Sequence, residues 1–316
     1  MASKSFPVDV EPKILRWLIK SSGWTEEEIS KKMKAPAENV CGWLGGELKP
    51  TLKDIEELSE ILKRPLATFF LPSPPVEKPI PHDYRMLPDK AGIFSKKTLL
   101  VIRRTRRIQT ISRELMANLG LATGASLGTA RMADDPERTA ISERNGFGIT
   151  PNIQINWKNS YDAFNAWRDM LNGKNIMVFQ MSMPIEDARG FSLADQEPFV
   201  IVVNSSDTIE ARIFTLFHEY GHLLLKDAGI CMPENAIRGA AQDGNAERWC
   251  NEFSSAVLLP RDQLNVDLRD RSRDELLDKF CLGGISRKYK VSKSALLLYM
   301  LKNRYITRIE YDAIQL

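Results

Sequence analysis

Two histidines and a glutamate near the middle of the chain have the types and the spacing of a metal site. His218, Glu219 and His222 lie in the stretch 214–225, FTLFHEYGHLLL, which holds two of the chain's three histidines. Residues four apart lie on one face of a helix, so both imidazoles can bind one metal ion, which we expect to be zinc. Glu219 can then take a proton from a water molecule at the metal and return it to a leaving amine. The alternative is a half-buried helix with two satisfied histidines and no metal.

A catalytic zinc site needs a third protein ligand and an open fourth position. No histidine follows His222, and the best candidates lie in 245–260, NAERWCNEFSSAVLLP, whose apolar spacing predicts a helix that ends before Pro260. Glu247 and Glu252 are both on this helix, but they lie about 140° apart around its axis, so only one of them can face the metal. The four cysteines form no C-x-x-C pair and are expected to be reduced, although Cys250 lies one turn from Glu247 and is a further candidate for a place at the metal.

The two motifs together resemble the ImmA/IrrE family of zinc metallopeptidases. HEYGHLLL is followed about 25 residues later by ERWCNEFSSAVLLP, and the family's second motif is E-x-x-A-N-x-F-A followed by L-x-P. The resemblance implies that His218, His222 and Glu247 are the three zinc ligands. It implies that Glu219 is the general base. Cys250 and Ser254 stand where the family usually has alanine, and both are small enough to keep the packing. The resemblance extends from about Pro79 to the C-terminus.

Short strand signals precede the metal helix. Residues 161–171 predict a helix, and the runs 176–180 (IMVFQ), 190–193 (GFSL) and 199–204 (FVIVVN) predict strands. A small sheet followed by the metal helix is the zincin arrangement, in which a strand beside the cleft pairs with the substrate backbone. We take 190–193 as the candidate for that edge strand, with an ordinary core strand as the alternative.

Loop is expected before the predicted strands, and helices are expected after the second motif. Residues 120–150 are rich in Gly, Ala and Ser and are expected to contain loop. After Pro260, the stretches 274–280, 285–289 and 292–303 predict helices, which form a helical C-terminal tail.

Residues 11–71 predict a bundle of short helices. Thr25 with Glu28 forms a capping box for the second helix, and Thr51 with Asp54 caps the fourth. The third helix is predicted at 37–44 and ends at a Gly-Gly pair. This order of helices resembles the Xre-type helix-turn-helix family.

The resemblance indicates DNA binding, but the charges match DNA poorly. In such domains the start of the third helix meets base edges, so Asn39 could contact an adenine, and Lys49 and Lys53 could hold phosphates. The first 76 residues carry eleven basic and eleven acidic side chains, whereas phosphate contacts supply most of the affinity for DNA. Binding of a protein, or dimerisation, is the alternative role.

Two further segments follow the first predicted domain. Residues 71–88 contain six prolines and predict an extended linker, which could lie across the active site. His82 lies in this linker, and a surface position fits it better than a metal ligand. Residues 96–113 carry seven basic side chains and no acidic one on a predicted helix, which is either a solvated face or a strip for phosphates or an acidic partner.

The sequence as a whole predicts an α+β protein of four parts. These are a helix-turn-helix domain at 1–71, a Pro-rich linker at 72–88, a zincin-like metallopeptidase domain at 89–265 and a helical subdomain at 266–316. By resemblance, the chain is a regulatory endopeptidase that cleaves a helix-turn-helix repressor and so controls mobile-element or stress-response genes. The alternative is a DNA-binding regulator or antitoxin-like protein whose metal site is structural or sensing. With no apolar run of eighteen residues and no leader, we expect a cytoplasmic protein that does not contact a membrane.

Overall fold

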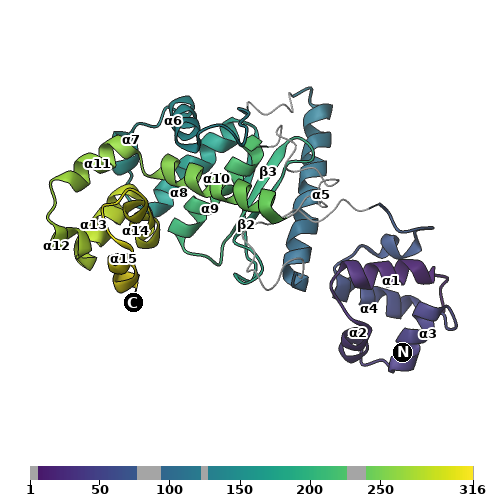
Figure 1. The fold of residues 1–316 in the computed structure, drawn as a ribbon. Coiled ribbons are helices and arrows are strands. Elements are labelled where there is room, and N and C mark those ends of the chain that lie inside the picture. The colour runs from purple at the N-terminus through teal and green to yellow at the C-terminus, as the bar shows by residue number, and fades with distance from the viewer. Residues whose placement is uncertain (1–5, 77–93, 122–126, 226–239, 316) are drawn as a thin grey trace. The chain divides into compact units, whose positions relative to one another are not determined.

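The described part of the chain folds into two compact units. The computed structural model describes residues 6–76, 94–121, 127–225 and 240–315 (Figure 1). One unit holds residues 6–76 and 94–104, and the other holds the remainder. The described residues are mostly helical with one three-stranded sheet, which confirms the α+β class. Among them, no helix is long and apolar enough to cross a membrane.

The first unit is a bundle of short helices around its own apolar core. Its elements are α1 (Pro12–Ser21), α2 (Glu26–Met33), α3 (Ala37–Gly45), α4 (Leu52–Leu62) and the 3-10 helix η1 (Leu66–Phe70). Both predicted capping boxes are present, with Thr25 and Glu28 at α2 and Thr51 and Asp54 at α4. Each box satisfies two backbone donors at a helix start. The core is formed mainly by the apolar stripes of these helices, including Ile14, Leu18, Ile29, Val40, Ile55 and Leu58.

The predicted basic helix is α5 (Lys96–Asn118). Its residues as far as Arg104 belong to the first unit, and those from Thr105 belong to the second. Four of the seven basic side chains contact partners within their own unit. The contacts are Lys96 with Glu28, Arg103 with the carbonyl oxygen of Leu62, Arg106 with Asp195, and Arg113 with Gln196. These contacts favour a packed helix over a strip that binds phosphates.

The second unit contains the sheet, and all three predicted strands are confirmed. They are β1 (Ile176–Met181), β2 (Gly190–Leu193) and β3 (Phe199–Asn204), in the order β1-β3-β2. β1 is parallel to β3, and β2 is antiparallel to it. Every residue of β3 is buried, which accounts for its continuous apolar run. β2 lies at one edge of the sheet, as expected.

Helices pack on this sheet and on one another. They are α6 (Pro136–Phe147), α7 (Pro151–Ile155), α8 (Ser160–Gly173), α9 (Ile209–Leu224) and α10 (Ala240–Leu258), and α9 lies beside α10 (Figure 1). The prediction of loop at 120–150 missed α6, although Asp135 caps it and Pro136 occupies its first turn. The signal was weak because α6 buries a polar residue, Arg144, beside Ala140 and so has little apolar periodicity.

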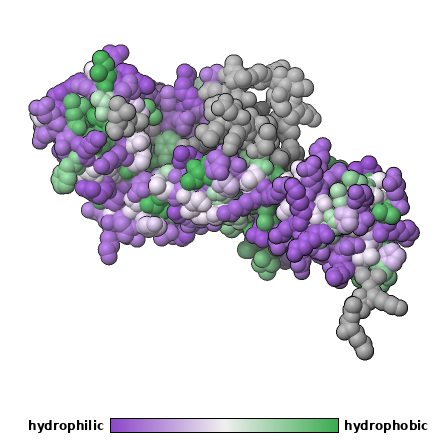
Figure 2. All heavy atoms as spheres, turned by 90° about the horizontal axis from the view of Figure 1, so that it is seen from below, coloured by the Kyte–Doolittle hydropathy of each residue, from purple (hydrophilic) through white to green (hydrophobic). Residues whose placement is uncertain are grey.

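The C-terminal part of the second unit is helical. It consists of α11 (Arg261–Arg269), α12 (Arg273–Leu277), α13 (Lys279–Tyr289), α14 (Lys293–Lys302) and α15 (Arg308–Gln315). The single helix predicted at 274–280 is wrong, because the Asp278 side chain accepts a hydrogen bond from the Cys281 amide at 2.6 Å and starts α13. On the face in Figure 2, hydrophilic residues dominate and hydrophobic ones are scattered, in keeping with apolar side chains buried in the cores.

Candidate metal centre

α9 is almost completely buried and carries the two histidines and the adjacent glutamate. Its first turn is capped by Thr208, whose hydroxyl accepts a hydrogen bond from the Ala211 amide at 3.3 Å. His218, Glu219 and His222 are at most 5% exposed. The two Nε2 atoms of the histidines lie 3.1 Å apart, because residues one helical turn apart share a face.

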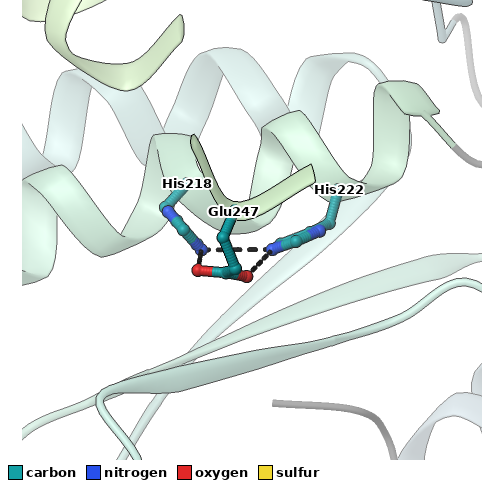
Figure 3. A group of neighbouring side chains, drawn as sticks. All are labelled: His218, His222 and Glu247. Atoms are coloured by element: carbon teal, nitrogen blue, oxygen red, sulfur yellow. Dashed lines mark hydrogen bonds and ion pairs between the residues drawn. The ribbon is translucent and has the colours of Figure 1, made fainter. Parts of the chain in front are cut away.

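α10 brings a carboxylate to the same point. The Oε2 atom of Glu247 lies 3.3 Å from Nε2 of His218, and its Oε1 atom lies 3.1 Å from Nε2 of His222. Figure 3 shows the two imidazoles and the carboxylate converging from separate helices. Glu252, the other candidate, instead lies 3.1 Å from Nζ of Lys302. The structure therefore brings Glu247, and not Glu252, to the histidines.

The separations of these three groups fit a small metal ion. In a tetrahedral zinc site with bonds of about 2.0–2.1 Å, neighbouring ligand atoms lie about 3.3 Å apart. The observed separations of 3.1, 3.1 and 3.3 Å are close to that value. Two imidazole nitrogens and a carboxylate oxygen are also a donor set that zinc accepts. The three residues form a group that could hold a metal ion.

The electrostatics of the group also favour a cation. Burial raises the pKa of the Glu247 carboxyl, but hydrogen bonds from His218 and His222 outweigh it and hold the pKa at about 2. Burial lowers the pKa of His222, but Cys250, Glu247 and Glu219 outweigh it and hold the pKa well above 6.5. The groups around the histidines thus stabilise positive charge, which a metal ion can supply.

Two hydrogen bonds orient the side chains at the centre. Nδ1 of His218 lies 3.1 Å from Oδ1 of Asn251 on α10, which leaves Nε2 facing the ligand group. The hydroxyl of Ser192 on β2 donates to Oε2 of Glu219 at 3.0 Å. The sequence analysis missed Ser192. Strand alternation could have indicated it, since Ser192 lies between two buried apolar residues that face the other side of β2.

Two glycines allow the elements to approach one another. A Cβ atom at Gly221 of α9 would lie 3.1 Å from Sγ of Cys250 and 3.3 Å from Cδ1 of Phe253, both on α10. A Cβ atom at Gly190 of β2 would lie 2.5 Å from Cγ2 of Thr215 on α9. The glycine between the two histidines therefore sets the distance between α9 and α10, and Gly190 sets the distance between β2 and α9.

The remaining candidate residues lie elsewhere. Cys250 is fully buried and lies within hydrogen-bonding reach of His222, but it is not in the three-residue ligand group. In the first unit, Asn39 is in the first turn of α3, Lys53 is in the first turn of α4, and Lys49 lies between them, 2.5 Å from Asp9. His82 and the linker from residue 77 lie outside the described residues.

Comparison with known families identifies the region that contains this centre. Residues 172–300 match the family model of the IrrE N-terminal-like domain, a peptidase family. The matched range contains the sheet, α9 and α10, and so includes all of the residues at the centre. The match supports a metallopeptidase of the ImmA/IrrE type in the second unit. No curated protein gives a significant match to the chain.

Proposed function

We propose that the chain is a zinc-dependent endopeptidase with His218, His222 and Glu247 as metal ligands. The observation that carries this proposal is the convergence of three ligand side chains from two helices, whose nearest nitrogen and oxygen atoms lie 3.1 to 3.3 Å apart. The match of this region to a peptidase family supports it further. A group that only stabilised the fold would have no use for a fourth side chain such as Glu219 beside it.

Glu219 acts as the general base in this proposal. Zinc bound at the centre would lower the pKa of a water molecule and polarise the carbonyl of the scissile peptide. The carboxylate of Glu219 takes a proton from the attacking water and delivers it to the leaving amine nitrogen. His218 is held in orientation by Asn251, so the ligand geometry is set before substrate binds.

The open edge of β2 is the proposed place for the substrate backbone. Among the residues that the structure describes, β2 pairs with β3 alone; it lies against α9, where a Cβ atom at Gly190 would contact Thr215. An extended peptide that pairs with this edge would run past Glu219, since Ser192 of β2 already contacts that carboxylate. Backbone pairing would hold the scissile carbonyl beside the centre.

The proposed substrate is a helix-turn-helix repressor, and the first unit is the proposed recognition module. This unit is a separate bundle of short helices with its own core, and its sequence resembles Xre-type domains. The first turn of α3 contains Glu38 and no basic residue. Its charge therefore suits a protein partner such as a repressor at least as well as it suits DNA. Asn39→Ala and Lys49→Ala should weaken binding of the partner, measured by fluorescence anisotropy against repressor and against DNA at two salt concentrations.

The test of the metal centre compares two substitutions on one helix. Purified wild type should contain about one zinc per chain, Glu247→Ala should lose it, and Glu252→Ala should keep it, because Glu252 pairs with Lys302 instead. Elemental analysis measures all three. Zinc retained in full by Glu247→Ala would refute the ligand assignment.

The test of catalysis uses a variant that keeps the metal. Glu219→Gln should retain zinc and lose cleavage of the repressor, followed by mass spectrometry of the products. Cleavage by Glu219→Gln would refute the general-base role. A zinc-loaded wild type that binds the repressor or DNA and cuts nothing would instead favour a regulator whose metal site is structural or sensing.

A further inference from the structure

We propose that Ser192 is the positioning residue for Glu219. The inference rests on the proposed function, because it concerns the residue assigned there as general base. Ser192 lies on the edge strand β2 and is half-buried, and its hydroxyl donates to Oε2 of Glu219 at 3.0 Å. The glutamate itself is 4% exposed, so a hydrogen bond from the protein replaces solvation that burial has removed.

The contact follows from the register of β2 along α9. Gly190 lies against Thr215, and Ser192 contacts Glu219. Two residues along a strand span about 6.6 Å, and four residues along a helix span about 6 Å, so the two steps match. Gly190 permits the close approach, since a Cβ atom there would lie 2.5 Å from Thr215. The close approach brings Ser192, the next residue on the same face of β2, to Glu219.

The hydrogen bond holds one oxygen of the Glu219 carboxylate at β2. A glutamate side chain has three rotatable bonds, and a general base is effective only when its oxygen lies within reach of the proton that it takes. Glu219 lies on the same buried helix as His218 and His222 and is next to His218 in the chain. Ser192 therefore limits Glu219 to fewer arrangements than an unbonded side chain would have.

The position of Ser192 also links the substrate to the base. β2 has one edge paired to β3 and is the proposed pairing strand for substrate. A peptide that pairs with β2 would fix the strand that carries the hydroxyl, so substrate binding and orientation of Glu219 would depend on the same four residues.

Steady-state kinetics on the full zinc-loaded chain test the role with the purified repressor substrate. Ser192→Ala should lower kcat by about 10- to 100-fold with KM and zinc content unchanged, as for residues that orient an active group. Ser192→Thr should recover most of the activity because it keeps the hydroxyl. Ser182→Ala is the matched control. Ser182 lies just after β1, and its hydroxyl contacts the hydroxyl of Ser206. Unchanged or increased kcat in Ser192→Ala would overturn the proposal.

A second measurement needs no catalytic activity and separates this inference from the proposed function. In metal-free protein, Ser192→Ala should lower the urea midpoint of unfolding, and the same change should have little effect when Glu219 is already alanine. Additive shifts in the two backgrounds would refute the contact. If Ser192→Ala fails to fold, Ser192→Cys replaces it, since a thiol is similar in size and a weaker donor. If the effects of the Ser192 and Glu219 substitutions are coupled but wild type cleaves no substrate, the proposed peptidase activity is refuted and the contact between the two residues is retained.

Discussion

Replacement of Gly221 by alanine tests whether the spacing between α9 and α10 sets the metal centre. The new Cβ atom would lie 3.1 Å from Sγ of Cys250 and 3.3 Å from Cδ1 of Phe253, whereas ordinary contacts of a Cβ atom lie at 3.4–4 Å. α10 must therefore move away by about 0.3 Å or more, which exceeds the tolerance of about 0.2 Å for metal-ligand distances. Because α10 carries Glu247, we expect zinc affinity to fall by about tenfold.

The stability of the same variant follows from two opposing terms. Alanine in a helix interior is favoured over glycine by about 1 kcal/mol. Overpacking against Cys250 and Phe253 costs about 1–3 kcal/mol, so the metal-free chain should lose about 0–2 kcal/mol of unfolding free energy. The double variant Gly221→Ala/Cys250→Ala lacks Sγ of Cys250, the atom nearest to the new Cβ atom. It should recover most of the lost zinc affinity and most of the lost unfolding free energy.

Zinc competition with a chromophoric chelator and urea unfolding of the metal-free protein measure the two quantities. Gly173→Ala is the control, because a Cβ atom at Gly173 meets nothing within 4 Å. A Gly221→Ala variant that binds zinc as tightly as wild type and is more stable by about 1 kcal/mol, the full gain in helix propensity, would show that α10 does not move.

Three further predictions concern polar contacts. Asn251→Ala should weaken zinc binding by about 10- to 100-fold in the same competition assay, because it orients His218 at 3.1 Å. Tyr220→Phe should lower the free energy of unfolding by about 1–3 kcal/mol without loss of zinc, since the buried hydroxyl donates to Glu143 at 2.5 Å on a face away from the ligands. Hydrogen bonds from the backbone and side chain of Thr307 and from an arginine of α12 lower the pKa of Glu310 from 4.5 to about 2. Its contribution to stability is therefore complete above pH 4.5 and lost as the pH falls towards 2, so wild type and Glu310→Gln should differ in thermal midpoint at pH 6 and converge at pH 2. A difference that persisted at pH 2 would contradict this sign.

The sequence was most informative where one period or one motif dominated. Short β-branched runs predicted all three strands, and the capping residues Thr25 and Thr51 predicted two helix starts. The spacing of His218 and His222 predicted that both imidazoles meet at one point, and the resemblance chose Glu247 as their partner. Local signals were enough for the strands, the caps and the two histidines, because these features depend on residues that are near in the chain, whereas Glu247 was assigned from the resemblance.

The features that sequence reasoning missed depend on contacts between distant segments. Ser192 contacts Glu219 only because the register of β2 on α9 brings together residues 27 apart. Helix geometry alone left Glu247 and Glu252 as alternatives, because the choice depends on how α10 is turned; the resemblance assigned Glu247, and Glu252 pairs with Lys302 of α14. α6 was missed because it buries Arg144, whose guanidinium donates to the carbonyl oxygen of Val257 in place of an apolar contact.

The two separate cores predict that zinc, if bound at the proposed centre, would act on only one of two melting transitions. Ligands from α9 and α10 can bind the ion together only in the folded second unit, whereas the first unit has a core of its own. Mass action then stabilises the second unit by about 2.7 kcal/mol at a free zinc concentration 100 times Kd. In differential scanning calorimetry at increasing zinc, one transition should move to higher temperature while the other stays in place. The metal would thereby serve as a reporter that tells the two parts of the chain apart in a single experiment.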